Sequence, residues 1–196
     1  MIKKKPNIIL VGGGGHCVSA IDVIENENKF NILGILDSDI KEEDVLGYRI
    51  LGGDNLIPKL VNENTYFLVT VGQIHSHGTR KKIAKTLVKY RAQLATVISP
   101  LAYVSEHACI EEGTIVMNHA VVNSKSKIGR NCIINTMSNV EHGVSIGDFC
   151  HISTCAVVNG DCVIGSGTFV GSNATISNGV TIRENSFISA GKLIVK

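Results

Sequence analysis

From Val104 onward, every sixth residue of this chain is Val or Ile, and the series continues without a miss to Ile194. Neither a helix of 3.6 residues per turn nor an ordinary alternating strand requires a period of six. Short strands that each point one branched side chain inward and then turn would produce it. The sequence therefore predicts a solenoid of short strands for residues 99–196.

The residues around these branched positions fit tight turns. Glycine directly follows the branched residue at four places, where the chain bends and one backbone approaches another: Gly129, Gly147, Gly165 and Gly171. Two residues before the branched position, most repeats hold a small residue: Ala108, Thr114, Ala120, Ser126, Cys132, Ser138, Cys150, Ala156, Cys162, Thr168 and Ala174. Three of the six cysteines thus fill a slot for a small apolar side chain, and no cysteine pair has zinc-ligand spacing. No metal site is predicted.

The repeat resembles the left-handed parallel β-helix of the hexapeptide-repeat acyltransferases. The resemblance implies that three six-residue units complete one 18-residue coil, which gives about five coils for this chain. Branched side chains stabilise such a core by about 1.5–3 kcal/mol each in gross terms. The core therefore needs few aromatic residues, which make up only 5% of the chain.

Residues 1–98 alternate between predicted strands and helices. The strands are Ile8–Val11, Ile32–Leu36 and Tyr66–Val71, and the helices are Val18–Asn28 and Arg80–Tyr90. This order is typical of a small parallel α/β unit, so the fold predicted is a Rossmann-like domain over residues 1–98 followed by the β-helix over residues 99–196. Ser99 and Pro100 are the predicted hinge.

Charge and hydropathy exclude several classes of protein. The formal net charge of +2 gives no reason to expect nucleic acid or an anionic membrane as a partner. The apolar run Ile8–Val11 is too short for a signal-peptide core, and no apolar run approaches the length of a membrane span, so we expect a cytoplasmic protein. The basic segment Arg80–Lys82 is interpreted as a solvated helix face that could also steer an anionic substrate.

A glycine cluster after the first strand is a candidate phosphate site. Gly12 to Gly15 precede a predicted helix, whose free N–H groups can receive a phosphate. Gly12 and Gly14 fit a dinucleotide fingerprint, but Cys17 stands where the third glycine belongs. Asp37, at the end of the second strand, could accept a ribose hydroxyl as in dinucleotide folds. A nicotinamide cofactor is therefore one interpretation of this half.

His142 is the histidine whose position is most informative. It lies two residues after the inward-pointing Val140, so its side chain is expected to project from the coil surface near a corner. An imidazole there could act as a general base, or it could be an ordinary solvated surface residue.

A set of segments across nearly the whole chain resembles the sialic acid O-acetyltransferase NeuD family. They are the Gly12–His16 loop, Leu36 to Asp39, Val71 to Gln73 with Arg80, Asn135 to Thr136, and Glu141 to Ser153. Within that family the chain is similar to the bacterial N-acetyltransferases of the bacillosamine pathway, which act on UDP-4-amino-4,6-dideoxy sugars. The resemblance implies acetyl-CoA as cosubstrate, no metal, and a homotrimer with sites between subunits.

The resemblance also implies roles for individual residues. His142 would be the general base, Asn135 would lie by the sugar, and His151 and the amide of Gly160 would contact acetyl-CoA near the thioester. Two further residues would line the pantetheine path: Ala190 and Gly191. The nucleotide-sugar would be held by the N-terminal residues Gly14, His16, Asp37 and Gly72.

The chain departs from the family pattern after the catalytic histidine. Gly143 stands where the family usually has an acidic residue that orients the imidazolium. Glu141 is expected to face away from His142, since neighbours along a strand point to opposite faces. We therefore expect Gly143→Asp to raise activity modestly. The sequence also stops at Lys196 inside a repeat, where the family usually has a further coil and a proline-containing tail.

Three other functions stay open from sequence. The chain could be a binding or scaffold homologue that has lost catalysis, as Gly143 would suggest. It could O-acetylate a sialic acid, with His142 deprotonating a hydroxyl. It could also be a γ-type carbonic anhydrase, although its available histidines lack a paired spacing: His107, His119, His142 and His151.

Overall fold

The computed structural model describes residues 5–196 and divides the chain into two compact units. One unit comprises the residues up to Gly72 together with Gly78–Ala95, and the other comprises Gln73–His77 and Thr96–Lys196. The predicted boundary at residue 99 differs from this division because Val97 and Ile98 already pair with Ile115 and Val116 in the solenoid.

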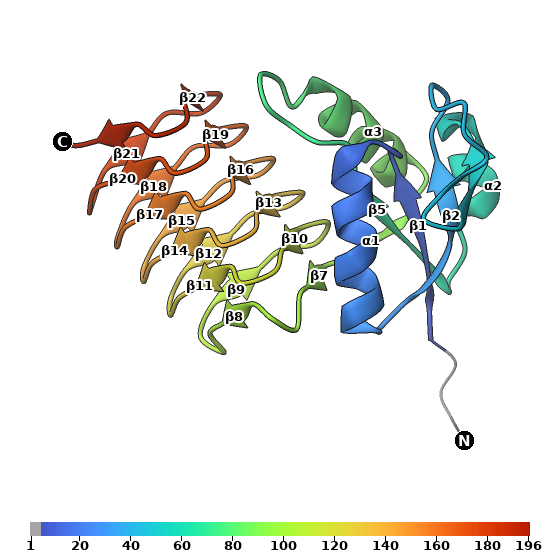
Figure 1. Ribbon diagram of the computed structural model, residues 1–196, viewed down its shortest axis with the longest axis horizontal. Coiled ribbons are helices and arrows are strands. Elements are labelled where there is room, and N and C mark those ends of the chain that lie inside the picture. The colour runs from blue at the N-terminus through green and yellow to red at the C-terminus, as the bar shows by residue number, and fades with distance from the viewer. Residues whose placement is uncertain (1–4) are drawn as a thin grey trace. The chain divides into compact units, whose positions relative to one another are not determined.

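The N-terminal unit is a six-stranded sheet with helices on both faces (Figure 1). Its elements are β1 (Asn7–Val11), α1 (Gly15–Glu27), β2 (Asn31–Leu36), β3 (Asp44–Val45), β4 (Tyr48–Gly52), the 3₁₀ turn Asp54–Leu56, α2 (Ile57–Leu60), β5 (Thr65–Val69), α3 (Gly78–Lys89) and β6 (Gln93–Leu94). The strand order is β3-β4-β2-β1-β5-β6, and only the β3–β4 pair is antiparallel. The predicted strands and helices are present, while β3, β4 and α2 were not predicted because they are short and poorly patterned.

The two faces of this sheet have separate apolar layers, as alternation along a strand requires. On one face Ile9 and Val11 pack with Ile83 and Leu87 of α3. Helix α1 lies against the opposite face (Figure 1) and buries its apolar stripe, which includes Ile21 and Ile24. Both layers are fully buried, so the central strands hold the loops at their carboxyl ends rigidly.

The C-terminal unit is a left-handed β-helix with three parallel sheets, and its coils are stacked along the solenoid in Figure 1. The first sheet contains β7 (Val97–Ile98), β10 (Ile115–Val116), β13 (Ile133–Ile134), β16 (His151–Ile152), β19 (Phe169–Val170) and β22 (Phe187–Ile188). The second contains β8 (Tyr103–Val104), β11 (Val121–Val122), β14 (Asn139–Val140), β17 (Val157–Val158), β20 (Thr175–Ile176) and β23 (Leu193–Ile194). The third contains β9 (Cys109–Ile110), β12 (Lys127–Ile128), β15 (Ser145–Ile146), β18 (Val163–Ile164) and β21 (Thr181–Ile182).

Six, six and five strands in these sheets amount to between five and six coils, close to the expected number. Each strand pairs with the strand 18 residues further along, for example Val140 with Val158. The branched residues and the small residues before them form one core cluster, in which Cys132, Cys150 and Cys162 are fully buried. The predicted packing of the repeat is therefore confirmed.

A second periodic position sets the corners of the coil. Every sixth residue from Gly113 to Gly191 has a positive φ, including His119, Asn131 and Asp161. Gly, Asn and Asp adopt this conformation at the lowest cost, which explains their frequency at these corners. The residue that follows each corner then returns the chain to the next strand.

No helix within residues 5–196 is long and apolar enough to span a membrane.

Candidate active site

His142 lies at the corner between β14 and β15, as the sequence predicted. Its side chain is 59% exposed, whereas Val140, two residues earlier, is fully buried. The corner therefore presents a titratable imidazole on a rigid solenoid surface.

The ring of His142 lies directly against the backbone of Gly160, the equivalent corner residue one coil later. A methyl group added to Gly160 would lie 2.6 Å from Cε1 and 2.7 Å from Nε2 of His142. Such contacts are far shorter than van der Waals distance, so only glycine fits here while the imidazole keeps its position. Gly160 is therefore required for space, since its φ is not in the left-handed region.

The backbone N–H of Gly160 has no acceptor among residues 5–196. At the equivalent position of an earlier coil, Asn123 accepts the N–H of Ser124 through its own side chain. Asn159 donates its amide to the carbonyl of Ile176, and its side-chain oxygen does not accept the Gly160 N–H. An imidazole and a free backbone donor are thus neighbours at one corner, which is the pair of groups that acyl transfer requires.

Asp161 brings a carboxylate to the same corner. Its Oδ1 lies 3.9 Å from Nδ1 of His142, and its backbone N–H donates to the carbonyl of His142 at 3.0 Å. Gly143 has a φ of +68°, and a Cβ built on it would collide with the Asp161 carboxylate. A side chain added at position 143 would therefore compete with the Asp161 carboxylate for the same space, and the gain in activity expected from Gly143→Asp stays a prediction.

Glu141, expected to face away from His142, instead has its carboxylate beside the backbone N–H of His142. Its carboxylate accepts the side-chain amides of Asn123 and Asn139, each at 3.0 Å. The Asn139 and Asn123 amides hold the pKa of Glu141 below its ordinary value. Glu141 is therefore a fixed anion that stiffens the strand ends before the corner.

Asn135 and His151 are hydrogen-bonded to each other, at a place separate from the His142 corner. The amide of Asn135 donates to Nε2 of the buried His151 at 3.0 Å, and Nδ1–H of His151 donates to the backbone carbonyl of Gln73 at 2.6 Å. The ring of His151 therefore joins Asn135 to the Gln73–His77 segment. The contact of His151 with acetyl-CoA that the resemblance implies stays a prediction.

Aromatic rings extend this anchor along the first sheet. His75 stacks on Phe187 at 5.0 Å between centroids, Phe187 stacks on Phe169 at 5.2 Å, and His151 meets Phe169 edge-on. Gln73 also donates its side-chain amide to the carbonyl of Phe149. No sequence signal pointed to this attachment, because the segment lies far from the solenoid along the chain.

Ala190 and Gly191 form the exposed corner after β22. Gly191 has a φ of +68° and open space around it, so its conformation explains the glycine. A Cβ on Gly171 would lie 2.5 Å from the amide nitrogen of Ala190, so the two coils pack backbone against backbone.

The glycine cluster of the N-terminal unit connects β1 to α1. Gly14 caps α1, and Gly14 and Gly15 are exposed, with nothing within 4 Å of a Cβ built on either of them. His16 lies in the first turn of α1, and its Cβ is 3.7 Å from one built on Gly72. The structure thus brings three predicted nucleotide-binding residues to one end of the helix.

The carboxylate of Asp37 accepts hydrogen bonds from the backbone of this glycine loop and of the residues that follow β2. Its carboxylate accepts the backbone N–H groups of Gly13 at 2.8 Å, Asp39 at 2.9 Å and Ile40 at 3.3 Å. Although partial burial opposes it, these three donors hold the pKa of Asp37 below its ordinary value of 3.8. A cavity of about 110 Å³ lies beside the carboxylate and is lined by Gly12, Asp54 and Thr79 among others. The carboxylate that could have met a ribose is therefore committed to the loop's own backbone.

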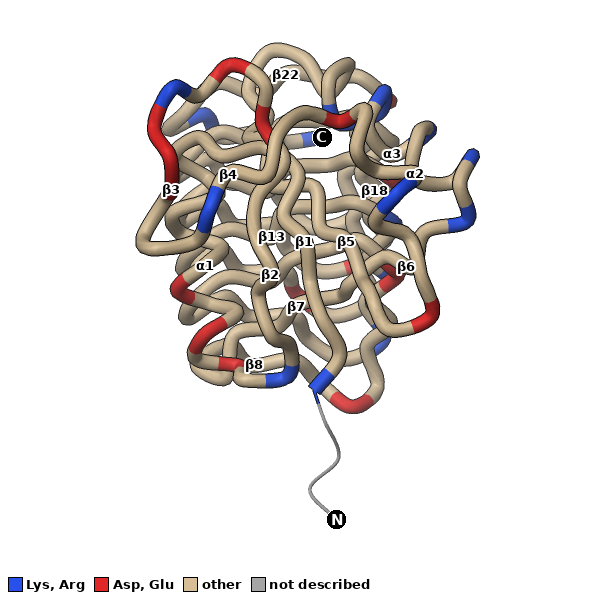
Figure 2. Tube along the Cα trace, turned by 90° about the vertical axis from the view of Figure 1, so that its right-hand side faces the viewer, with Lys and Arg blue, Asp and Glu red and all other residues tan. Residues whose placement is uncertain are grey.

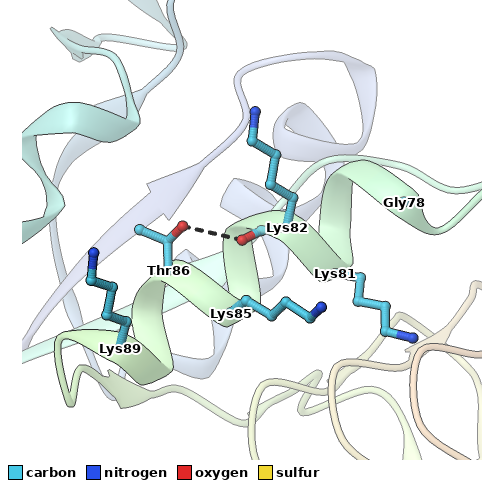
Figure 3. Close-up of a pocket in the computed structure, with 6 residues that line it drawn as sticks. All are labelled: Gly78, Lys81, Lys82, Lys85, Thr86 and Lys89. Carbon is cyan, nitrogen blue, oxygen red and sulfur yellow. Dashed lines mark hydrogen bonds between the residues drawn. The ribbon is translucent and has the colours of Figure 1, made fainter.

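Helix α3 presents a lysine-rich face. Figure 3 shows Lys81, Lys82, Lys85 and Lys89 around a shallow groove of about 400 Å³, with Thr86 bonded to the carbonyl of Lys82. Elsewhere, acidic and basic positions are interspersed along the trace (Figure 2). Arg80, expected to belong to this face, is instead buried and donates to the carbonyls of Val69 and Val71. The basic face of α3 is thus made by lysines alone.

Within residues 5–196 there is no group of three or more His, Cys, Asp or Glu side chains arranged to hold a metal ion.

Two family models match the chain. Residues 7–87 match the PglD N-terminal domain, and residues 161–196 match the bacterial transferase hexapeptide (six repeats). A curated relative, UDP-N-acetylbacillosamine N-acetyltransferase of Bacillus subtilis, is 30% identical over 120 residues, which are 57% of this chain and 51% of the relative. The aligned part thus covers about half the length of that relative.

Solved structures resemble nearly the whole chain. The acetyltransferase domain of PglB from Neisseria gonorrhoeae, in complex with acetyl coenzyme A, has a TM-score of 0.91 and 27% identity, and the match covers 98% of this chain and 92% of that one. A histidine variant of perosamine N-acetyltransferase from Caulobacter crescentus, in complex with CoA and GDP-perosamine, has a TM-score of 0.90 and 28% identity, with 97% and 89% covered. The fold is that of a hexapeptide-repeat protein. The chain combines a PglD-type N-terminal domain over residues 7–87 with bacterial transferase hexapeptide repeats over residues 161–196, the two parts expected from the sequence.

Proposed function

We propose that this protein transfers the acetyl group of acetyl-CoA to the amino group of a nucleotide-linked amino-deoxy sugar, of the UDP-4-amino-4,6-dideoxy-N-acetylhexosamine type. The names of two relatives support it, since one is a UDP-N-acetylbacillosamine N-acetyltransferase and the other is a perosamine N-acetyltransferase in complex with CoA and GDP-perosamine. In this chain, the observation that carries the proposal is the exposed imidazole of His142 set against Gly160, whose N–H is free.

The chemistry at this corner is acyl transfer through a tetrahedral intermediate. The sugar amine attacks the thioester carbonyl, a C–N bond forms, and Nε2 of His142 takes the proton that the amine loses. The Gly160 N–H donates to the carbonyl oxygen as it becomes an oxyanion. The C–S bond then breaks, and the CoA thiolate leaves, with the imidazolium as its proton source.

The open N-terminus of α1 supports a nucleotide site in the N-terminal unit. Gly14 and Gly15 at the start of α1 are exposed, and a helix N-terminus favours the negative charge of a diphosphate. His16 and Gly72, which lie beside it, are proposed to contact the same nucleotide. Asp37 is proposed to act indirectly, by holding the backbone of Gly13 in the glycine loop.

A homotrimer is part of the proposal. Four of the six outward side chains of the second sheet are apolar or aromatic, namely Tyr103, Val121, Val157 and Leu193, while Asn139 and Thr175 are polar; Tyr103 is 59% and Leu193 is 65% exposed. A mostly apolar row along a sheet suits a second copy of the chain. Because β14 belongs to this sheet, a neighbouring subunit there would lie next to His142 and supply the rest of a shared site. A cytoplasmic location is also proposed, since no membrane-spanning helix is found in residues 5–196.

The proposal is tested by assaying the trimeric protein with acetyl-CoA and a panel of UDP-, GDP- and CMP-linked amino sugars, with thiol release as readout. His142→Ala should lower kcat by about 10²–10⁴-fold, because general-base assistance contributes that much. His119→Ala, another exposed histidine at a corner, is the matched control and should retain wild-type kcat. Retention of more than half of kcat by His142→Ala would refute the base assignment, and acetylation of hydroxyl acceptors alone would replace N-transfer by O-transfer.

A further inference from the structure

We propose that Asp161 is the positioning carboxylate of His142, supplied by the next coil of the solenoid. This rests on the proposed function, in which His142 is the general base. The observation is the juxtaposition of three corner residues from two coils, His142, Gly143 and Asp161.

The carboxylate is held where it can act on one ring nitrogen. Asp161 Oδ1 lies 3.9 Å from His142 Nδ1, and the Asp161 N–H donates to the His142 carbonyl at 3.0 Å. The backbone bond fixes the spacing of the two corners, so a small side-chain rotation brings the carboxylate within hydrogen-bond reach. Catalytic hydrogen bonds are often long before substrate binds.

Gly143 makes this approach possible. A Cβ at residue 143 would collide with the Asp161 carboxylate, so the missing side chain leaves the space that the carboxylate fills. Residues 143 and 161 occupy the same corner position on successive coils, and both have φ near +60°, namely +68° and +58°. The geometry thus lets either position carry the acidic residue, but not both at once.

Among residues 5–196, Glu141 is the other carboxylate that interacts with His142, and it does so at the backbone N–H. Both oxygens of Glu141 are engaged by the amides of Asn123 and Asn139. The Asp161 carboxylate has no other hydrogen bond or ion pair within residues 5–196. Its negative charge is therefore directed to His142.

The chemical effect follows from which nitrogen faces the carboxylate. Asp161 favours the tautomer with its proton on Nδ1, so the lone pair lies on Nε2, the atom beside Gly160. It also stabilises the imidazolium that forms when Nε2 takes the amine proton. Asp161 thereby acts through His142 and touches no reacting atom.

Asp161→Gly should lower kcat about tenfold, between the several-fold effect of an exposed ion pair and the far larger effect of a buried orienting aspartate. The KM values for acetyl-CoA and the amino sugar should stay within about twofold, because neither substrate loses a contact. Glycine suits the positive φ at this corner, so folding should be preserved. Asp161→Asn, which keeps the shape and removes the charge, should also lose kcat.

The decisive variant exchanges the two corners, Gly143→Asp with Asp161→Gly. It should recover kcat to within about threefold of wild type, because the carboxylate returns to His142 from the other side. Asn173→Gly removes a side chain at an equivalent positive-φ corner in another column, and it should leave kcat unchanged. Thermal unfolding of each variant reports whether the fold is intact.

The outcomes separate this proposal from the one on which it rests. If His142→Ala is inactive while Asp161→Gly keeps more than half of kcat, the positioning role is overturned and the base assignment stands. If Asp161→Gly is impaired but the exchanged variant is not rescued, Asp161 acts structurally and the proposal is also overturned. Activity of His142→Ala would remove the base assignment and this proposal together.

Discussion

Gly160→Ala is the substitution that most directly tests the His142 corner. The added methyl would lie 2.6 Å and 2.7 Å from Cε1 and Nε2 of His142, whereas ordinary contacts between such atoms begin near about 3.5 Å. The imidazole must therefore move by roughly 1 Å, and a misplacement of that size costs about 10²-fold in rate. We expect kcat to fall about 100-fold.

Stability should respond differently from activity. The φ of Gly160 suits any L-residue, and the nearest obstacles are side chains of His142 and Asn178, which can rotate into solvent. Replacing glycine by alanine at a compatible position stabilises a protein by about 0.4–1 kcal/mol through the unfolded chain. The melting temperature should therefore stay the same or rise slightly.

The matched control is Gly171→Ala, where the new methyl would meet backbone atoms of residues 188–190 at 2.5–2.7 Å. Backbone cannot rotate away, so this variant should lose stability. Steady-state kinetics and thermal unfolding of both variants distinguish the two effects. The reasoning is refuted if Gly160→Ala keeps more than half of kcat, or if its kcat falls only in proportion to a lower melting temperature.

Three further predictions concern the surrounding structure. Asp37→Asn should lower the free energy of unfolding by about 1–2 kcal/mol at pH 7. Because the pKa of Asp37 is lowered in the folded state, urea titrations should show the full difference above pH 3.8 and a smaller difference as the pH falls below that value. His151→Ala should leave the buried Gln73 carbonyl and Asn135 amide unpaired at a cost of about 1–3 kcal/mol, and hydrogen exchange should show faster opening of residues 73–77. If the lysines of α3 steer the anionic substrates, kcat/KM should fall as added salt shortens the screening length from about 30 Å to 8 Å, and an unchanged kcat/KM would exclude steering.

The repeat could be predicted from sequence because each six-residue unit specifies the same local structure. Branched residues such as Val140 and Val158, 18 residues apart, can only point inward, so the coil and its register follow from spacing. The N-terminal sheet was predicted only in part. Strand β4 was missed although Gly47 precedes it in a two-residue hairpin turn and Gly52 ends it, because its side chains are only half-buried or exposed and give no apolar run.

The attachment of His151 to Gln73 could not be predicted, since it joins residues 78 positions apart and depends on no repeated pattern. From the sequence, His151 was interpreted through the role that the family resemblance implies. Its burial and its hydrogen bonds to Asn135 and Gln73 are visible only in the structure. Arg80 shows the same limit. Its spacing along the helix places it with the basic residues, yet its guanidinium points inward and donates to the carbonyls of Val69 and Val71 at the end of β5. This orientation depends on three-dimensional packing, which spacing does not show.

The residues around His142 could be predicted only in part. They are present in the sequence, but the 18-residue period of the coil is needed to find which of them lie against His142. Adding 18 to 142 and 143 gives Gly160 and Asp161, the two residues that the structure places against His142 and Gly143. The next residue along the chain lies in the same coil. A residue 18 positions later lies at the equivalent position of the next coil, one strand spacing away. In a β-helix the partners of a catalytic side chain are therefore found more reliably at one coil's distance than at the next residue, and an acidic residue absent from position 143 can be supplied from position 161 without any change in the fold.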